Sequence, residues 1–439
     1  MSIVSILLTL LILGLLTTFH ETGHFLVAKL LGIKVEEFSI FVGPALFSWQ
    51  RNGVQYRIRC IPFAAYVRYK GMEGEGDPDD PEMFFNHPRW KRLLTSLAGP
   101  AMNIILGVII FLTVFSAFGF NSLRVAEPPE DSQMATWNLQ EEVRVESGDR
   151  IIRMNGKRIF TDRDIQYVFM MTPDIDPIDV TLRSARTGEE YSIVLTPEVR
   201  VMYRLGISFR NSVATDGGFR VVAVEPESNG GNPVLLVGDI IFSVNGIDIT
   251  DEDFSEKLSA YGDSPLTVSL DRDGERIELN MRATPYDVGN PRGVVLYTGS
   301  GVWETIEQSF AYPVSILRLT VMSLADIFSG RVAPTDALSG PLGMMTIVSD
   351  VVDAPEADNR MKFEQLGLLA GFFSVAVAFS NLLPIPGLDG NALILLIVEM
   401  IRGKKLSLKT ESVINAVGFV CLILLVFFAL FSDIFRLVN

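Results

Sequence analysis

Three ionisable residues stand at metal-site spacing inside an apolar stretch near the start of the chain. His20, Glu21 and His24 form a His-Glu-x-x-His pattern, and no residue from Ile3 to Leu16 carries a charge. On a helix, the two histidines are one turn apart, so both imidazoles leave the same face and can share one Zn²⁺. Glu21 is then placed to take a proton from the attacking water. Because ionisable side chains are costly at membrane depth, their presence here indicates function.

A pattern with three fixed positions can also arise by chance. This chain, however, has only three histidines, and two of them lie in the pattern. They interrupt an apolar helix, where a core histidine without a partner is unfavourable. These facts favour a metal site. The remaining histidine, His87, lies in an Asn-His-Pro turn, and we expect it to be solvated rather than metal-bound.

A hydrolytic zinc site usually has three protein ligands and one open position. Asp389 is the best candidate for the third ligand, because it follows a proline-interrupted helix end. Taken alone, Leu388-Asp389-Gly390 is more simply an ordinary turn; the motif and the topology below favour the ligand. Ligation by two histidines and one aspartate favours a single Zn²⁺ per chain without excluding other metals.

The composition indicates a membrane protein with an acidic soluble region. The 439 residues are 48% hydrophobic, with a mean hydropathy of +0.32. The net charge of −15 is uneven, since residues 121–300 hold 18 Lys and Arg against 30 Asp and Glu. This argues against nucleic-acid binding, which requires a basic surface. The two cysteines, Cys60 and Cys421, lie in different contexts, and no structural disulfide is expected.

We expect four membrane spans, at about residues 3–31, 93–118, 366–383 and 413–431. The first has no basic leader or cleavage site, so it is interpreted as a retained helix rather than a signal peptide. Residues 304–331 are also apolar, but charges punctuate them, which suits a helix lying at the membrane interface.

Basic residues predict the topology. The loop 32–92 carries nine Lys and Arg, and the loop 384–411 carries four. By the positive-inside rule both loops face the cytoplasm, so the central region and both termini lie outside. His20 and Asp389 then approach the same cytoplasmic face and can meet there. If residues 304–331 spanned the membrane as well, Asp389 would lie on the opposite side.

Two further segments bear on the site. Residues 35–49 and 54–67 are rich in β-branched and aromatic residues, with Gly-Pro and Asn-Gly turn signals, so we expect strands beside the membrane. The second span opens with Ala98-Gly99-Pro100, whose small residues permit close helix packing. Asn103 follows at membrane depth. An interhelical hydrogen bond is its simpler interpretation, and support for the metal site is the alternative.

The central region contains an internal repeat. Gly148-Asp149 to Ile159 matches Gly238-Asp239 to Ile249 at an offset of 90 residues, with a shared Asn-Gly turn. We therefore infer two tandem α+β domains. The pattern resembles PDZ domains in circularly permuted form, which bind peptides by adding a strand to a sheet edge. A spacer or size filter is the alternative role, and the first copy lacks the usual upstream glycine.

Taken together, these motifs resemble the site-2 protease family. The resemblance rests on His-Glu-x-x-His in a first span, Ala-Gly-Pro-x-x-Asn opening a second, and Asn-x-x-Pro-x-Pro-x-Leu-Asp-Gly ending a third. Tandem PDZ domains between the second and third spans resemble its bacterial regulator-of-sigma-E protease branch. The resemblance implies an inner-membrane zinc protease with periplasmic PDZ domains. It would cut a single-span substrate within the bilayer after prior external cleavage, an anti-sigma factor above all, with remnant signal peptides as a second class.

The resemblance also implies residue roles. His20, His24 and Asp389 match the zinc ligands, Glu21 the general base, and Asn381 the polar residue that contacts substrate or steadies the oxyanion. The strand-rich loop matches a membrane-associated β element that holds the substrate extended. Two positions depart from the family pattern: Ala64-Ala65 replaces Gly-Gly, and Asn391 replaces a second glycine.

The expected fold is a polytopic α-helical membrane protein with four spans, a β-rich loop and two extracytoplasmic PDZ domains. Its order is a first span with the metal motif (1–31), a cytoplasmic-side β-rich loop (32–92), a second span (93–120), two PDZ domains (121–205 and 206–290), an interfacial region (301–361), a third span with the Leu-Asp-Gly motif (362–390), a cytoplasmic loop (391–411) and a fourth span (412–435). Expected partners are the lipid bilayer, a transmembrane substrate and a peptide or protein ligand of the PDZ domains. The competing hypotheses are a non-catalytic scaffold presenting PDZ domains to envelope peptides, and a metal transporter.

Overall fold

The computed structural model describes residues 2–71, 80–130, 132–135, 145–213, 218–249, 254–332, 340–354, 358–404 and, in part, 413–433. The described chain divides into two compact units. A helical unit holds the residues up to Ser122, the segment Phe160–Asp164 and the residues from Thr298 onward. A β unit holds Leu123–Ile159 and Ile165–Tyr297.

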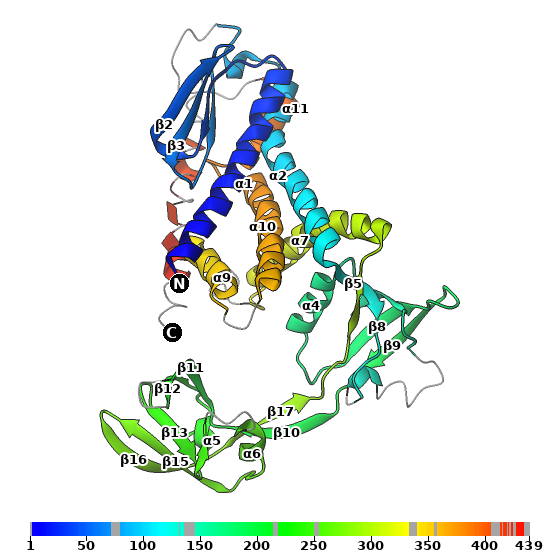
Figure 1. Ribbon diagram of the computed structural model, residues 1–439, viewed down its shortest axis with the longest axis vertical. Coiled ribbons are helices and arrows are strands. Elements are labelled where there is room, and N and C mark those ends of the chain that lie inside the picture. Colours follow the sequence, from blue (N-terminus) through cyan, green and yellow to red (C-terminus); the bar gives the residue numbers. More distant parts are fainter. Residues whose placement is uncertain are drawn as a thin grey trace. The chain divides into compact units, whose positions relative to one another are not determined.

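Long apolar helices build the helical unit (Figure 1). They are α1 (Ile3–Leu30), α2 (Arg89–Phe118), α7 (Val302–Phe328), α9 (Pro341–Val352), α10 (Asn359–Leu382) and α11 (Asp389–Arg402). Four of these, α1, α2, α7 and α10, are long and apolar enough to cross a membrane. The expected spans at 3–31, 93–118 and 366–383 coincide with α1, α2 and α10. The expected fourth span at 413–431 is described only in part, and the residues that are described there are helical.

Glycines let the helices approach closely. A Cβ on Gly23 of α1 would lie 2.3 Å from the Ala98 carbonyl oxygen of α2. Further along α2, a Cβ on Gly107 would lie 2.8 Å from a Val375 methyl group of α10. In a membrane, where lipid competes equally for apolar surface, such close packing is a main source of helix association. The small residues thus let α1 approach α2 near Ala98 and let α10 approach it near Gly107.

Helix α7 contacts one end of this bundle. Tyr312 and Ile316 in its middle pack with Phe111 and Phe115 near the end of α2, and with Val375 of α10. Figure 1 shows α7 crossing the bundle rather than running beside α2 along its length. The crossing supports an interfacial helix, while the length and hydropathy of α7 also suit a span. Its interfacial position stays a prediction.

The residues after the third span correct one expectation. Residues 391–411 were expected to form a loop, but α11 continues from Asp389 to Arg402 before the chain leaves the described residues. Its apolar side chains pack against α2, and Glu399 pairs with Arg92 of α2 at 2.7 Å. Packing against a neighbouring helix, here through buried residues such as Leu396, is what stabilises most short helices.

The β-rich loop forms a four-stranded mixed sheet. Its strands are β1 (Val35–Ile40), β2 (Val42–Arg51), β3 (Val54–Ile61) and β4 (Tyr66–Tyr69), in the order β2-β3-β1-β4. A one-turn 3₁₀ helix, η1 (Phe84–Asn86), follows. Val35, Phe38 and Tyr69 form a core with Ala28 of α1. The expected strands are therefore present, and β4 is an edge strand lying near the second half of α1.

The β unit contains two antiparallel sheets built on one plan. The first has β5 (Phe120–Val125), β6 (Arg150–Met154), β7 (Lys157–Arg158), β8 (Ile178–Arg183), β9 (Glu190–Leu195) and β18 (Leu296–Gly299), in the order β18-β5-β6-β8-β9 with β7 beside β6. The second has β11 (Ile207–Val213), β12 (Phe219–Val224), β13 (Ile240–Val244), β14 (Ile247–Asp248), β15 (Pro265–Arg272) and β16 (Glu275–Arg282), in the order β11-β12-β13-β15-β16 with β14 beside β13. Helices α4 (Asp162–Met171), α5 (Ser228–Gly231) and α6 (Phe254–Ser259) accompany them, and β10 (Val199–Arg204) pairs with β17 (Thr284–Gly289).

The repeated Asn-Gly motif adopts the same turn in both sheets. Asn155 and Asn245 have φ values of 45° and 50°, and the following glycines have 72° and 79°. Both positive φ values are those of a type I′ hairpin turn. In each copy the asparagine side chain also accepts a backbone N–H from the neighbouring strand, at Asp179 and Thr267.

The domain boundaries differ in one respect from those expected. Strand β18 belongs to the first sheet, although it follows the second sheet in the chain. Ala126 donates its backbone N–H to the Val295 carbonyl just before β18. The first domain is therefore completed by residues beyond 290, and the second is inserted within it. Pairing between strands distant in sequence leaves no local signal.

Candidate active site

The two histidines of the motif lie on α1 and face the interior. Their side chains are 7% and 8% exposed, and their Nε2 atoms are 3.2 Å apart. Phe19 and Leu26, beside the motif, are instead exposed on the outer surface of the helix. The helical spacing therefore does what the sequence predicts and brings both imidazoles to one point.

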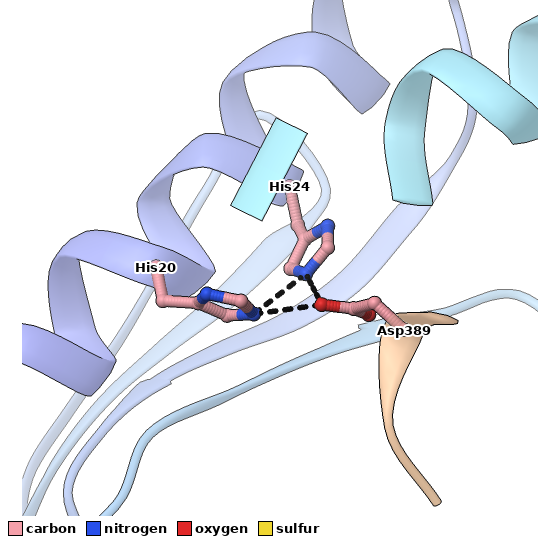
Figure 2. Close-up of side chains that lie close together, drawn as sticks. All are labelled: His20, His24 and Asp389. Carbon is pink, nitrogen blue, oxygen red and sulfur yellow. Dashed lines mark hydrogen bonds and ion pairs between the residues drawn. The ribbon is translucent and has the colours of Figure 1, made fainter. Parts of the chain in front are cut away.

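Asp389 reaches this point from the first turn of α11. Helix α10 ends at Leu382, and Gly387, with a φ of 97°, turns the chain into α11. The Asp389 Oδ2 atom lies 2.9 Å from His20 Nε2 and 3.2 Å from His24 Nε2. Figure 2 shows the three side chains converging from α1 and α11. Residues 365 or more positions apart thus form one cluster.

Gly99 provides the space beside these ligand atoms. A Cβ at this position would lie 2.3 Å from His24 Nε2 and 2.6 Å from His20 Nε2. Real Cβ atoms keep at least ~3 Å from non-bonded atoms. The backbone of α2 therefore passes directly against the cluster, and glycine is needed for the cluster to keep this geometry.

Groups on α2 contact the far side of both imidazoles. His24 Nδ1 lies 2.7 Å from the Thr95 carbonyl oxygen and donates a hydrogen bond to it. A histidine that donates through Nδ1 has the Nε2 lone pair free for a metal, which is the usual arrangement at metal sites. On the other ring, His20 Nδ1 lies 3.5 Å from Asn103 Nδ2.

The cluster fits a zinc ion. Two nitrogens and one carboxylate oxygen are a common donor set for Zn²⁺. In a tetrahedral site with bonds of ~2.1 Å, two ligand atoms are about 3.4 Å apart. The separations of 2.9 to 3.2 Å here are close to that value. Two imidazole lone pairs and a carboxylate directed at one point need a positive charge between them, and a metal ion supplies it.

Glu21 lies beside the cluster and lines the same cavity as His24 and Asp389. Val67 of the edge strand β4 lines this cavity as well. The general base expected from the motif is therefore next to the ligands without being one of them. This is the placement that proton transfer to and from a hydrolytic water requires.

The cavity has a volume of about 650 Å³ and is mostly apolar. Besides the site residues, its walls comprise Tyr66, Val67 and Tyr69 of β4, Phe84 and Phe85 of η1, Thr95 and Ser96 of α2, and Gly387, Leu388, Asn391, Ala392 and Leu395 around the start of α11. The space lies between α1, α2, α11 and the sheet edge. An extended apolar peptide segment would fit this kind of surface.

Several residues of the site could not be identified from the sequence. The Tyr69 hydroxyl is buried against the cavity and has no hydrogen-bond partner among the described residues. Thr95 acts through its backbone carbonyl, which any residue would supply. The small residues of Ala98-Gly99-Pro100 predict close packing, but they do not predict that the metal ligands are the packing partner.

Other expected site residues have mixed outcomes. Asn381 lies on the last turn of α10, half-buried, and is not among the residues that line the cavity. Its substrate role stays a prediction. Asn391, one of the two departures from the family pattern, does line the cavity. His87 is outside the metal-ligand cluster found among the described residues.

Comparison with known proteins identifies the family. A family model described as "Peptidase family M50" matches residues 8–425. A protein of Thermotoga maritima named "Putative zinc metalloprotease" is 26% identical over 96% of this chain and 97% of its own length. A protein of Clostridium acetobutylicum with the same description is 24% identical over the whole length of both chains.

Among solved structures, the crystal structure of the HtrA3 PDZ domain bound to a phage-derived ligand is 24% identical. The match covers 21% of this chain and 92% of that one, with a TM-score of 0.17. A structural likeness of this size carries no argument about the β unit. The match across residues 8–425, by contrast, includes every residue of the metal cluster and Glu21. The chain therefore belongs to peptidase family M50 and is a zinc metalloprotease with membrane helices.

Proposed function

We propose that this protein cleaves single-span membrane proteins within the bilayer. The observation that carries the proposal is the position of the site on a lipid-compatible helix. The metal cluster is buried two-thirds of the way along α1, while Leu15, Phe19 and Leu26 around it are exposed. Exposed leucine and phenylalanine on a membrane helix face lipid. A substrate reaching this cavity would therefore arrive from the bilayer.

The residues have distinct tasks in hydrolysis. Zinc, when held by His20, His24 and Asp389, polarises the scissile carbonyl and lowers the pKa of the attacking water. The Glu21 carboxylate takes the proton of that water and then delivers it to the leaving amine nitrogen. The Thr95 carbonyl keeps His24 oriented through Nδ1.

The edge strand β4 supplies a way to hold the substrate. A transmembrane helix hides its peptide bonds, so the segment to be cut must first unwind. Its freed N–H and C=O groups need new partners in the membrane, and pairing with a sheet edge satisfies them. Tyr66, Val67 and Tyr69 of β4 all line the cavity, so a paired segment would lie beside Glu21.

We further propose that the substrate is an anti-sigma factor that another protease has shortened outside the membrane. In this proposal the protein lies in a bacterial inner membrane, with the site near the cytoplasmic face and the β unit in the periplasm. The basic loops support this orientation. The two sheets would act as PDZ domains that bind a peptide or exclude substrates by size.

The test is cleavage of a single-span peptide in liposomes that contain the purified protein. We expect cleavage by the wild type, loss of cleavage with a zinc chelator, and recovery when zinc is restored. Glu21→Gln should lower the rate by ~10²–10⁴-fold with zinc still bound. Glu304→Gln, in the first turn of α7, is the matched control and should cleave normally. Wild-type rates in Glu21→Gln would refute the assignment.

A further inference from the structure

Asn103 is buried in the middle of the helical unit, next to the metal ligands. Its side chain has no exposed surface, and it stands on the apolar helix α2. Its Nδ2 atom lies 3.5 Å from His20 Nδ1, while its Oδ1 atom has no hydrogen-bond partner among the described residues. A buried amide oxygen without a partner costs about 1–3 kcal/mol.

The two ends of the amide cannot both be satisfied in this rotamer. With Nδ2 facing the ring, His20 Nδ1 must act as the acceptor, and a neutral ring then carries its proton on Nε2. That proton would point at Asp389 and occupy the lone pair that a metal requires. A half turn about the terminal torsion, which has two nearly equivalent positions for asparagine, exchanges Oδ1 and Nδ2.

The half turn places Oδ1 against His20 Nδ1 and moves Nδ2 to the position that Oδ1 held. Asn103 Oδ1 then accepts a hydrogen bond from the His20 Nδ1–H group, so the orphaned oxygen gains a partner. The same hydrogen bond puts the Nε2 lone pair toward the cluster. His20 then has the same arrangement as His24, whose Nδ1 donates to the Thr95 carbonyl at 2.7 Å.

We propose that Asn103 is a positioning residue of the metal site, which accepts a hydrogen bond from His20 Nδ1 and holds its Nε2 atom toward the metal. The proposal rests on the zinc site described above. It also gives a common explanation for one face of α2. Thr95, Gly99 and Asn103 are spaced four residues apart, so they lie along one face of the helix. The first orients His24, the second leaves room for both rings, and the third orients His20.

Asn103 is held in place independently of its side chain. Its backbone carbonyl accepts a hydrogen bond of 2.7 Å from Ser374 Oγ on α10. This contact anchors α2 at the level of His20. It also offers a control, because removing the Ser374 hydroxyl weakens helix packing and leaves the side-chain amide of Asn103 in place.

The test measures zinc affinity by competition with a coloured chelator, using the full chain in detergent micelles. Asn103→Leu keeps the branching of the side chain and removes the acceptor, and we expect it to weaken zinc binding by ~10–100-fold. Asn103→Asp keeps an oxygen acceptor and should bind zinc within a few-fold of the wild type. Ser374→Ala should leave the affinity unchanged. Wild-type affinity in Asn103→Leu, or an equal loss in Asn103→Asp, would overturn the proposal.

A second measurement does not depend on any Asn103 variant folding. The chain has only three histidines, so ¹⁵N-histidine labelling of His87→Gln leaves only the His20 and His24 rings visible by NMR. In the zinc-loaded protein we expect His20 to carry its proton on Nδ1, hydrogen-bonded. A proton on His20 Nε2, or zinc bound through Nδ1, would overturn the proposal. Neither measurement uses cleavage. If the protein binds zinc in this way but cuts no peptide, the proposed function is refuted and the role of Asn103 is not.

Discussion

Replacing Gly99 by alanine adds one methyl group directly against the metal ligands. The new Cβ would lie 2.3 Å from His24 Nε2 and 2.6 Å from His20 Nε2. Because a Cβ keeps at least ~3 Å from non-bonded atoms, His24 Nε2 would have to retreat by roughly 0.7 Å. Metal sites tolerate deviations of only about 0.2 Å in ligand distance. The substitution should therefore disrupt the site although none of the ligand residues is itself replaced.

Helix stability and metal binding should respond in opposite directions. Alanine is a better helix former than glycine by ~0.8–1.0 kcal/mol, so α2 should keep its helical content. Zinc affinity should fall at least ~100-fold, which corresponds to about 2.7 kcal/mol. Chelator competition measures the affinity, and far-ultraviolet circular dichroism checks the helices. The opposite signs separate a local steric effect from unfolding.

Gly107→Ala is the matched control on the same helix. Its Cβ would also be crowded, at 2.8 Å, but against a Val375 methyl group rather than against a ligand. We expect zinc affinity close to that of the wild type in Gly107→Ala. Wild-type zinc affinity in Gly99→Ala would refute the steric reasoning. An equal loss in both variants would show that general helix packing, not contact with the ligands, controls the site.

Three further perturbations test other parts of the structure. Arg92→Met removes one side of the buried Arg92–Glu399 ion pair at 2.7 Å and should lower the free energy of unfolding by about 3–5 kcal/mol. Arg92→Met with Glu399→Met should recover most of the loss, and additive effects in thermal unfolding would contradict this. Tyr69→Phe removes a buried hydroxyl that has no partner among the described residues, so the Tm should be unchanged or higher, and a fall of several degrees would contradict this. Burial alone raises the pKa of Asp239, but hydrogen bonds from Arg272 and the Leu236 N–H outweigh it and hold the pKa below its usual value. This stabilisation is complete above the unfolded pKa of about 3.9 and is lost as the pH falls below it. Hydrogen exchange in the second sheet should therefore speed up in acid. In Asp239→Asn, the exchange should be faster at neutral pH and should depend less on pH.

Much of this protein could be predicted from local patterns. The spacing of His20 and His24 dictates a shared helix face, and the structure has it. The repeated Asn-Gly pairs dictate type I′ turns, because few other residues accept positive φ at both positions. The apolar runs coincide with α1, α2 and α10. These features depend on residues within one or two turns of each other, which is why the sequence alone determines them.

The remaining features depend on which distant segments meet. Asp389 was a candidate ligand from topology, but only the fold places its carboxylate within 3.2 Å of both imidazoles. The role of Gly99 follows from the close approach of α1 and α2, and the role of the Thr95 carbonyl from the rotation of α2. The helical form of α11 and the place of β18 in the first sheet were not expected. Each arises from packing or pairing between segments far apart in the chain, which local residue patterns do not encode.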